Sequence, residues 1–427
     1  MLYHSERFGA KVLPMSAVDD FLCCLAPGAT VYVAGSCAEP RGLLDLVEAN
    51  RDQLHDLCFI QQPLGAVNKR DLSALVRDSR QRSFFMAPQL QVGLDEGRIE
   101  FVPMHMRAIF DHLRNIRLDV ALLQAARDQH GVLRFGPNLD YVDAVLASAA
   151  AVVIEENLDF VAPQTTPPVE ESSVEVIVPC HGGVPTCPIA EPDGTSDKIG
   201  VLIADLINDG DCIQTGIGAV PAAILSNLKN KSDLGFHGGL MDDGFVRLIE
   251  AGNLTGSRKG LDQGKHVLGM ALGSETMLDW LAHSKKASAV IFRGANYTHE
   301  ATVICQLDNF VSINSAIEVD LMGQVNAEVA GGQQVSGTGG CVDFMRATKM
   351  SRGGRAIVAM SSTARRGSLS RIVPRVDIVT ALRTDVDIVV TEFGVAALKD
   401  APLAARRERL IAIAHPDFRD ELRSAIT

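Results

Sequence analysis

The sequence contains no apolar run long enough to cross a bilayer and no run of lysines and arginines. Its longest apolar stretch, AVLASAAAVVI at 144–154, is well short of the roughly 20 residues that a membrane helix needs. The formal net charge is −12, which disfavours a surface for nucleic acid or anionic lipid. The N-terminal MLYHSERFGA lacks the apolar core of a signal peptide. We therefore expect a cytoplasmic protein with no nucleic-acid or membrane partner.

A disulfide framework and a metal site are also not indicated. The nine cysteines are odd in number and scattered, and several lie inside apolar stretches, where a reduced thiol packs as a small hydrophobic group. Cys180, His181 and Cys187 are close in sequence, but their spacing fits no common zinc pattern. We predict no bound metal, and a proline-rich loop at this point.

The composition indicates a compact chain with more than one domain. Of its 427 residues, 47% are hydrophobic and 22% charged, which is ordinary for a globular protein, and the length suggests two domains. Short β-rich runs at 30–36, 151–157, 356–360 and 386–392 alternate with helical patterns, which is typical of parallel sheets covered by helices. Between 161 and 197 the sequence becomes rich in proline, serine and acids, so we expect a domain boundary there.

Two glycine-rich stretches are candidate ligand sites. In QTGIGAVPAAILSNL (214–228), Gly216 and Gly218 follow a predicted strand and precede a helix. Free amides at such a helix start attract anions, although a tight turn would also need these glycines. In GQVNAEVAGGQQVSGTGGCVDF (323–344), five glycines fall within ten residues, which indicates either a backbone that approaches a ligand closely or a flexible loop.

Three stretches offer carboxylates. Glu392 ends a buried-looking strand, before Gly394 and a predicted helix, where either a ligand site or a helix cap is expected. Glu318 lies in a strand-like alternation whose acids could equally be solvated. GFHGGLMDDG (235–244) is predicted to be a strand that turns into a helix, with Asp242 and Asp243 as acids that cap the helix start.

Several motifs together, in order, resemble the acetyl-CoA hydrolase/transferase family. They are VYVAGSCAEP, TGIGAVP, INSAIEVDLMGQV, SGTGGCVDF, VTEFGVAALK and AHPDFR. The most similar branch looks like the bacterial 4-hydroxybutyrate and butyrate CoA-transferases. The resemblance implies two CoA-transferase-type α/β domains, which we set at 1–185 and 186–427, with the active site at their junction in a homodimer. It also implies that coenzyme A is a substrate, that no cofactor is bound, and that the second partner is a small carboxylate.

The resemblance carries roles to particular residues. Gly216, Ile217 and Gly218 resemble the mobile loop over the acyl site. Gly340, beside Gly339 in the substrate-binding loop, resembles the glycine whose amide stabilises the tetrahedral intermediate.

Further roles concern side chains. Glu392 resembles an auxiliary active-site glutamate, and Phe85 in SFFMAP resembles an acyl-pocket phenylalanine. Arg365 stands where the family has a basic residue, and with Arg366 it is our candidate for the CoA phosphates. Two solvated loop arginines are the alternative.

One position departs from the family pattern. In this family a glutamate attacks the acyl-CoA and forms a glutamyl anhydride and then a glutamyl-CoA thioester. In gapless register Gly235, His237, Asp243 and Gly244 match the pattern around that glutamate, and Gly239 stands in its place.

A glycine cannot form an anhydride, so three interpretations remain open. In the first interpretation the protein is a thioesterase, and Asp242, His237 or Glu392 activates the attacking water. Alternatively, it is a CoA-transferase in which Glu318 or Asp242 is the nucleophile or the two substrates react directly. In the third interpretation it binds acyl-CoA without turnover.

Overall fold

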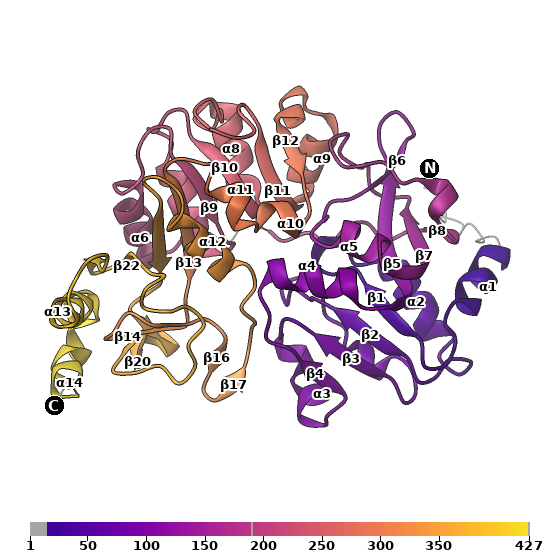
Figure 1. Cartoon of the computed structure of the whole chain (residues 1–427), viewed down its shortest axis with the longest axis horizontal. Coiled ribbons are helices and arrows are strands. Elements are labelled where there is room, and N and C mark those ends of the chain that lie inside the picture. Colours follow the sequence, from indigo (N-terminus) through magenta and orange to yellow (C-terminus); the bar gives the residue numbers. More distant parts are fainter. Residues whose placement is uncertain (1–14, 189–190, 426–427) are drawn as a thin grey trace, which may run out of the picture.

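A computed structural model describes residues 15–188 and 191–425, and shows two halves, each built around an eight-stranded sheet (Figure 1). The first sheet has the order β4-β3-β2-β1-β5-β7-β8, with β6 beside β5. All its pairs are parallel except β5–β6. Its strands are β1 (Thr30–Val33), β2 (Cys58–Gln61), β3 (Arg80–Ser83), β4 (Ile99–Phe101), β5 (Leu118–Arg127), β6 (Leu133–Phe135), β7 (Ala149–Asn157) and β8 (Val176–Cys180).

Both faces of the first sheet are buried. Val31 and Val33 of β1 pack in one apolar cluster, while Tyr32 between them packs in another. This follows from the period of two along a strand, and it explains why a strand covered on both faces is apolar throughout. The helices of this half are α1 (Met15–Cys23), α2 (Arg41–Ala49), α3 (Gln91–Asp95), α4 (Met106–Asn115) and α5 (Val142–Leu146).

The second sheet has the order β12-β11-β10-β9-β13-β18-β22-β23 and is parallel except for its last pair, β22–β23. Its strands are β9 (Cys212–Thr215), β10 (Gly235–Met241), β11 (His266–Ala271), β12 (Val290–Phe292), β13 (Phe310–Ser315), β18 (Arg355–Ala359), β22 (Ile388–Thr391) and β23 (Gly394–Ala397). A three-stranded sheet and two short hairpins add β14 (Glu318–Asp320), β15 (Val325–Asn326), β16 (Val329–Ala330), β17 (Gln333–Gln334), β19 (Thr363–Ala364), β20 (Leu369–Ser370) and β21 (Ile372–Val373).

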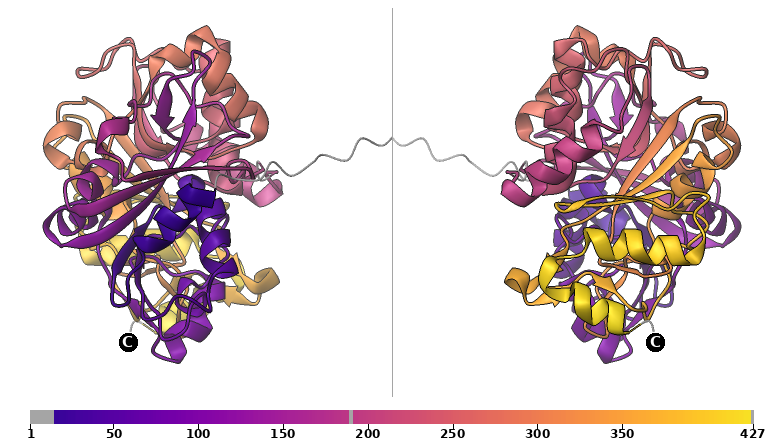
Figure 2. Two further views of the ribbon diagram at one scale, coloured as in Figure 1. Left: turned by 90° about the vertical axis from the view of Figure 1, so that its right-hand side faces the viewer. Right: turned by 90° about the vertical axis from the view of Figure 1, so that its left-hand side faces the viewer.

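Helices cover this second sheet, and α13 and α14 lie on its outer side, away from the first half (Figures 1 and 2). They are α6 (Gly194–Ala204), α7 (Ala219–Asn227), α8 (Asp243–Ala251), α9 (Glu275–His283), α10 (Ala295–Thr298), α11 (Ala301–Ile304), α12 (Cys341–Thr348), α13 (Leu403–Ile413) and α14 (Arg419–Ser424). Within the described ranges, none of the helices has the length and apolar content that crossing a membrane requires. The N-terminal MLYHSERFGA, interpreted above as no signal peptide, lies outside those ranges.

The predicted fold class, mainly parallel sheets covered by helices, is confirmed, but one predicted element is wrong. The segment after Glu392 is a strand, β23, and not a helix. Gly394 has φ +137, a backbone conformation that side chains disfavour and glycine permits. The chain therefore reverses there, and Val395 pairs with Val390 in antiparallel register. The next helix, α13, begins only at Leu403.

The two halves are joined by a short segment of the first half that pairs with β11. Leu139 donates its N–H to the Gly269 carbonyl at 2.9 Å, and Ala271 donates to the Pro137 carbonyl at 2.9 Å. Strand β12 pairs only with residues 266–268, so this segment completes the rest of β11. The Asp140 carbonyl also accepts the N–H of Ala295, at 2.8 Å, where α10 begins.

Replacing Gly269 with alanine should destabilise this junction. A Cβ at 269 would lie 1.9 Å from Oδ1 of Asp140, so the joining segment would have to move. We expect a loss of about 2–3 kcal/mol in the free energy of unfolding, the usual scale for overpacking, measured by urea denaturation. Gly194→Ala is the control, because a Cβ there meets nothing within 4 Å. Equal stability of the two variants would contradict the close approach.

Candidate active site at the junction of the halves

Strand β10 carries Gly239 in a fully buried setting. All seven of its residues are buried, and it lies between β9 and β11. The space where a side chain at 239 would begin is occupied by an imidazole. A Cβ on Gly239 would lie 2.9 Å from Cε1 and 3.0 Å from Nε2 of His299. The glycine at the expected nucleophile position is thus matched by a histidine ring that fills the adjacent space.

His299 comes from the end of α10, about 60 residues further along the chain. Its Nδ1 lies 2.8 Å from Oγ1 of Thr298, and its ring packs on that of Phe344, with 4.5 Å between centroids. Only 2% of the residue is exposed. Burial lowers the pKa of His299 to about 3, so its imidazole is neutral at physiological pH.

Gly340 also lies against Nε2 of this ring. It is the residue at the start of α12, and a Cβ there would lie 2.2 Å from Nε2 of His299. The same loop contacts the first half. The Gly339 carbonyl accepts the N–H of Met106 at 3.1 Å, and Phe85 would lie 3.6 Å from a Cβ on Gly339. Gly239 and Gly340 therefore lie against the His299 ring, and Gly339 connects this group to Phe85 of the first half.

His237 lies two residues before Gly239 on β10, but it is engaged in supporting α10. Its Nε2 is 3.1 Å from the carbonyl oxygen of Thr298, and its ring lies near those of Tyr297 and Phe310. Burial lowers the pKa of His237 to about 3. The structure thus gives His237 a positioning role behind the residue that contacts Gly239.

Asp242 caps α8, as predicted, and also borders a cavity. Its Oδ1 accepts the N–H of Gly244 at 2.9 Å. The cavity, of about 240 Å³, is also lined by Ile217, Gly218 and Cys187. Burial raises the pKa of Asp242 to about 6. Asp242 is three positions after Gly239, which is about 10 Å along a strand, so the carboxylate does not replace a side chain at 239.

Asp243 makes different hydrogen bonds from those of Asp242. Its carboxylate accepts the N–H of Ser274 at 2.9 Å and binds the Ser274 hydroxyl. Ser274 is in turn the cap of α9. Asp243 therefore ties the starts of two helices together beside the same cavity.

The loop Gly216–Ile217–Gly218 follows β9 and leads into α7. Gly218 has φ +117, which favours glycine at this helix start. A Cβ on Gly216 or Gly218 would meet nothing within 4 Å. Ile217 packs with Leu240 and with Cys37 of the first half. This loop borders the cavity and has open space above its glycines.

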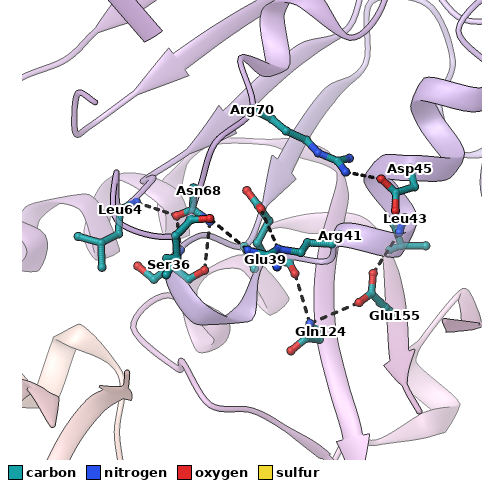
Figure 3. Close-up of polar contacts among 12 residues, drawn as sticks. Ser36, Glu39, Arg41, Leu43, Asp45, Leu64, Asn68, Arg70, Gln124 and Glu155 are labelled. Atoms are coloured by element: carbon teal, nitrogen blue, oxygen red, sulfur yellow. Dashed lines mark hydrogen bonds and ion pairs between the residues drawn. The ribbon is translucent and has the colours of Figure 1, made fainter. Parts of the chain in front are cut away.

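The turn after β1 is fixed against this cavity by a buried polar network (Figure 3). Oδ1 of Asn68 accepts the N–H groups of Ser36, at 2.8 Å, and of Leu64, at 2.7 Å. Gln61 donates to Glu39 at 3.2 Å, and burial raises the pKa of Glu39. The network holds the segments that bring Cys37 and Val67 against Leu240 and Leu272 of the second half.

Three predicted residues lie elsewhere. Glu392 follows β22, four strands from β10, or roughly 19 Å at ordinary strand spacing, and it accepts bonds from the N–H and hydroxyl of Ser362 at 2.8 and 2.7 Å. Glu318 accepts a bond from Asn326. Arg365 is exposed at the β19–β20 hairpin, 3.6 Å from a Cβ position on Gly331. None of these side chains joins the group around Gly239.

Two buried groups at the junction were not found by sequence reasoning. One is His299. The other is Asp140, which is 3% exposed and whose Oδ1 has no hydrogen-bond partner in the described part of the chain. Burial raises the pKa of Asp140 to about 8. Both roles depend on packing between distant segments, and neither residue belongs to a local motif. Among the residues described, no cluster of His, Cys, Asp and Glu is placed to hold a metal ion.

Comparison with known proteins identifies the class. Residues 18–177 match the acetyl-CoA hydrolase/transferase N-terminal domain, and residues 273–426 match the C-terminal domain. The 4-hydroxybutyrate coenzyme A transferase of Clostridium kluyveri is 35% identical over 400 residues, 92% of both chains. The butyryl-CoA:acetate CoA-transferase of Anaerostipes caccae is 37% identical over 77% of this chain and 76% of its own. The chain belongs to the acetyl-CoA hydrolase/transferase family.

Hydrolases and solved structures are also among its relatives. An acetyl-CoA hydrolase of Yarrowia lipolytica is 31% identical over 49% of this chain and 39% of its own length. The crystal structure of RipA from Yersinia pestis superposes with a TM-score of 0.87 and 32% identity, over 96% of each chain. The family therefore includes both transferases and hydrolases.

Asp140→Asn should make the stability of the protein less sensitive to pH. The folded-state pKa of about 8 lies above the unfolded value near 4, so Asp140 costs folding stability progressively as pH rises from about 4 to 8. We expect the variant to gain stability over the parent by a few kcal/mol between about pH 5 and pH 8, measured by urea unfolding. Exposed Asp52→Asn is the control for losing one charge. A difference independent of pH would contradict the assignment.

Proposed function

We propose that this protein acts on acyl-CoA thioesters of small carboxylic acids and hydrolyses them with water, without a covalent glutamyl-enzyme. The observation that supports hydrolysis is the absence of a side chain at Gly239 together with the imidazole that fills the adjacent space. Asp242 is about 10 Å along the chain from Gly239 and roughly 19 Å separates the strands of Gly239 and Glu392. The carboxyl group of Asp140 lies beside the Gly239 carbonyl, but burial raises its pKa to about 8, so at neutral pH it does not supply the carboxylate of a transferase relay.

Other parts of the site favour thioester chemistry. Gly340 stands at the start of α12, where backbone N–H groups are free to stabilise the oxyanion that forms when a thioester carbonyl is attacked. Phe85 supplies an apolar side chain beside the Gly339 loop, suited to a short acyl group. We propose Ile217, Gly218 and the adjoining cavity as the path for the pantetheine arm. Arg365, exposed on its hairpin, is proposed for a CoA phosphate.

CoA transfer is the second candidate, and one observation favours it. Asp242 borders the cavity beside Gly218, and its raised pKa of about 6 reflects a partly desolvated carboxylate, the kind of environment found for catalytic acids and nucleophiles. The transferases among the relatives support the same reading. Coenzyme A as substrate without a bound cofactor, a homodimer and a cytoplasmic location also remain proposals.

Thiol release from short acyl-CoAs distinguishes the candidates. A hydrolase should release free CoA from acetyl-, propionyl- or butyryl-CoA at a rate that added acetate leaves unchanged. A transferase should instead need acetate or another acid and form its CoA ester. Borohydride added with acyl-CoA should leave a hydrolase active, and mass spectrometry should find no adduct. Affinity for CoA by calorimetry with no turnover of any acyl-CoA would overturn both candidates.

A glutamate at position 239 should give CoA transfer only if the His299 ring beside it is also removed. Gly239→Glu alone places its Cβ 2.9 Å from the His299 ring, so we expect an inactive or destabilised protein. Gly239→Glu with His299→Ser removes that ring and should gain CoA transfer to acetate together with borohydride sensitivity. Transfer activity in the single variant would show that the His299 ring does not exclude the glutamate. Transfer in neither variant would contradict the assignment of Gly239 to the nucleophile position.

A further inference from the structure

One imidazole nitrogen faces the two glycines of the proposed site. Nε2 of His299 lies 3.0 Å from a Cβ position on Gly239 and 2.2 Å from one on Gly340. The first glycine occupies the position where a glutamate side chain is expected, and the second carries the proposed oxyanion amide. A single ring nitrogen therefore lies between the place of the missing side chain and the residue that carries the proposed oxyanion amide.

The hydrogen bonds behind the ring select its tautomer. The Thr298 hydroxyl donates to the Gly294 carbonyl at 3.3 Å, so its oxygen remains as an acceptor. Nδ1 of His299 lies 2.8 Å from that oxygen, and it carries the proton and donates it when the hydroxyl donates to Gly294. In a neutral imidazole the other nitrogen then has a free lone pair. In this tautomer Nε2 faces the glycines as a proton acceptor.

We propose that His299 is the general base that activates water for acyl-CoA hydrolysis, with Thr298 as the residue that orients it. This inference rests on the proposed hydrolase function and names the residue that replaces the glutamate. The arrangement of a base held in one tautomer by a second hydrogen bond is a common way to activate a weak nucleophile.

The step balances in atoms and charge. Nε2 removes a proton from water as the water oxygen forms a bond to the thioester carbonyl carbon, and the carbonyl oxygen becomes an oxyanion near the Gly340 amide. The carbon–sulfur bond then breaks, and the proton on Nε2 passes to the leaving sulfur. The products are the free carboxylic acid and CoA thiol, with His299 neutral again.

Other titratable groups at the junction are placed less suitably for this role. His237 lies behind α10 with its Nε2 against the Thr298 carbonyl. Asp140 approaches from the β11 side and is held neutral by burial up to about pH 8, because that is where burial raises its pKa. Of these groups, only His299 contacts both glycines.

Replacing His299 with asparagine in the full-length protein tests the proposal. We expect kcat for thiol release from the best acyl-CoA of the panel to fall about 100- to 10,000-fold, the range for general-base catalysis, with KM and the calorimetric affinity for CoA little changed. His266→Asn is the matched control. His266 is also buried, and it begins β11, three residues before Gly269. Its variant should keep the parental kcat.

Chemical rescue separates a base from a structural residue. His299→Ala removes the ring, and added imidazole should restore thiol release in proportion to its concentration, while leaving the parent and His266→Asn unaffected. If the parent hydrolyses acyl-CoA and the His299→Asn variant does so equally well, the role of His299 is overturned, but the proposed function is not. A parent with no hydrolysis would overturn the proposed function itself. Loss of activity together with lost CoA affinity and no rescue would also refute the base.

Discussion

The two halves of the chain meet because β11 is longer than the strand beside it. Strand β12 covers residues 266–268 and leaves the following residues of β11 with free backbone groups. Buried N–H and C=O groups need partners, and residues 137–139 of the first half supply them. This pairing places Asp140 against Gly269 and beside the Gly239 carbonyl. Together with the hydrogen bond from Met106 to the Gly339 carbonyl, this pairing places the first half over the site.

The candidate site is built around three glycines, whose lack of a side chain lets other segments pack closely against them. Gly239, Gly269 and Gly340 each leave a space that a side chain of another segment enters: His299 at two of them and Asp140 at the third. Both entering groups are fully buried, and burial shifts their pKa in opposite directions, because it favours the neutral form of each. The junction therefore contains an uncharged acid and an uncharged base beside neighbouring glycines of β10 and β11.

Much of the fold could be predicted from the sequence because its signals are local. The apolar runs at 30–36 and 151–157 became β1 and β7, and Asp242 caps α8 as its position suggests. The segment after Glu392 could not be predicted correctly, since its alanines favour a helix while pairing with β22 decides otherwise. Gly239 was singled out through the family pattern. His299 was missed because tertiary packing, and not a local motif, places its ring against Gly239 and Gly340, which are 60 and 41 residues away.

The interlock of Gly239, His299 and Gly340 also limits how such a protein can change over time. A glutamate that arises at 239 while the imidazole is present meets the ring, and an imidazole lost first leaves neither group at the site. If residues 239 and 299 have the roles proposed above, each single step between the two arrangements passes through a form without a working centre. Residues 239 and 299 should accordingly be inherited as a pair, and the identity of one should foretell the identity of the other in related chains.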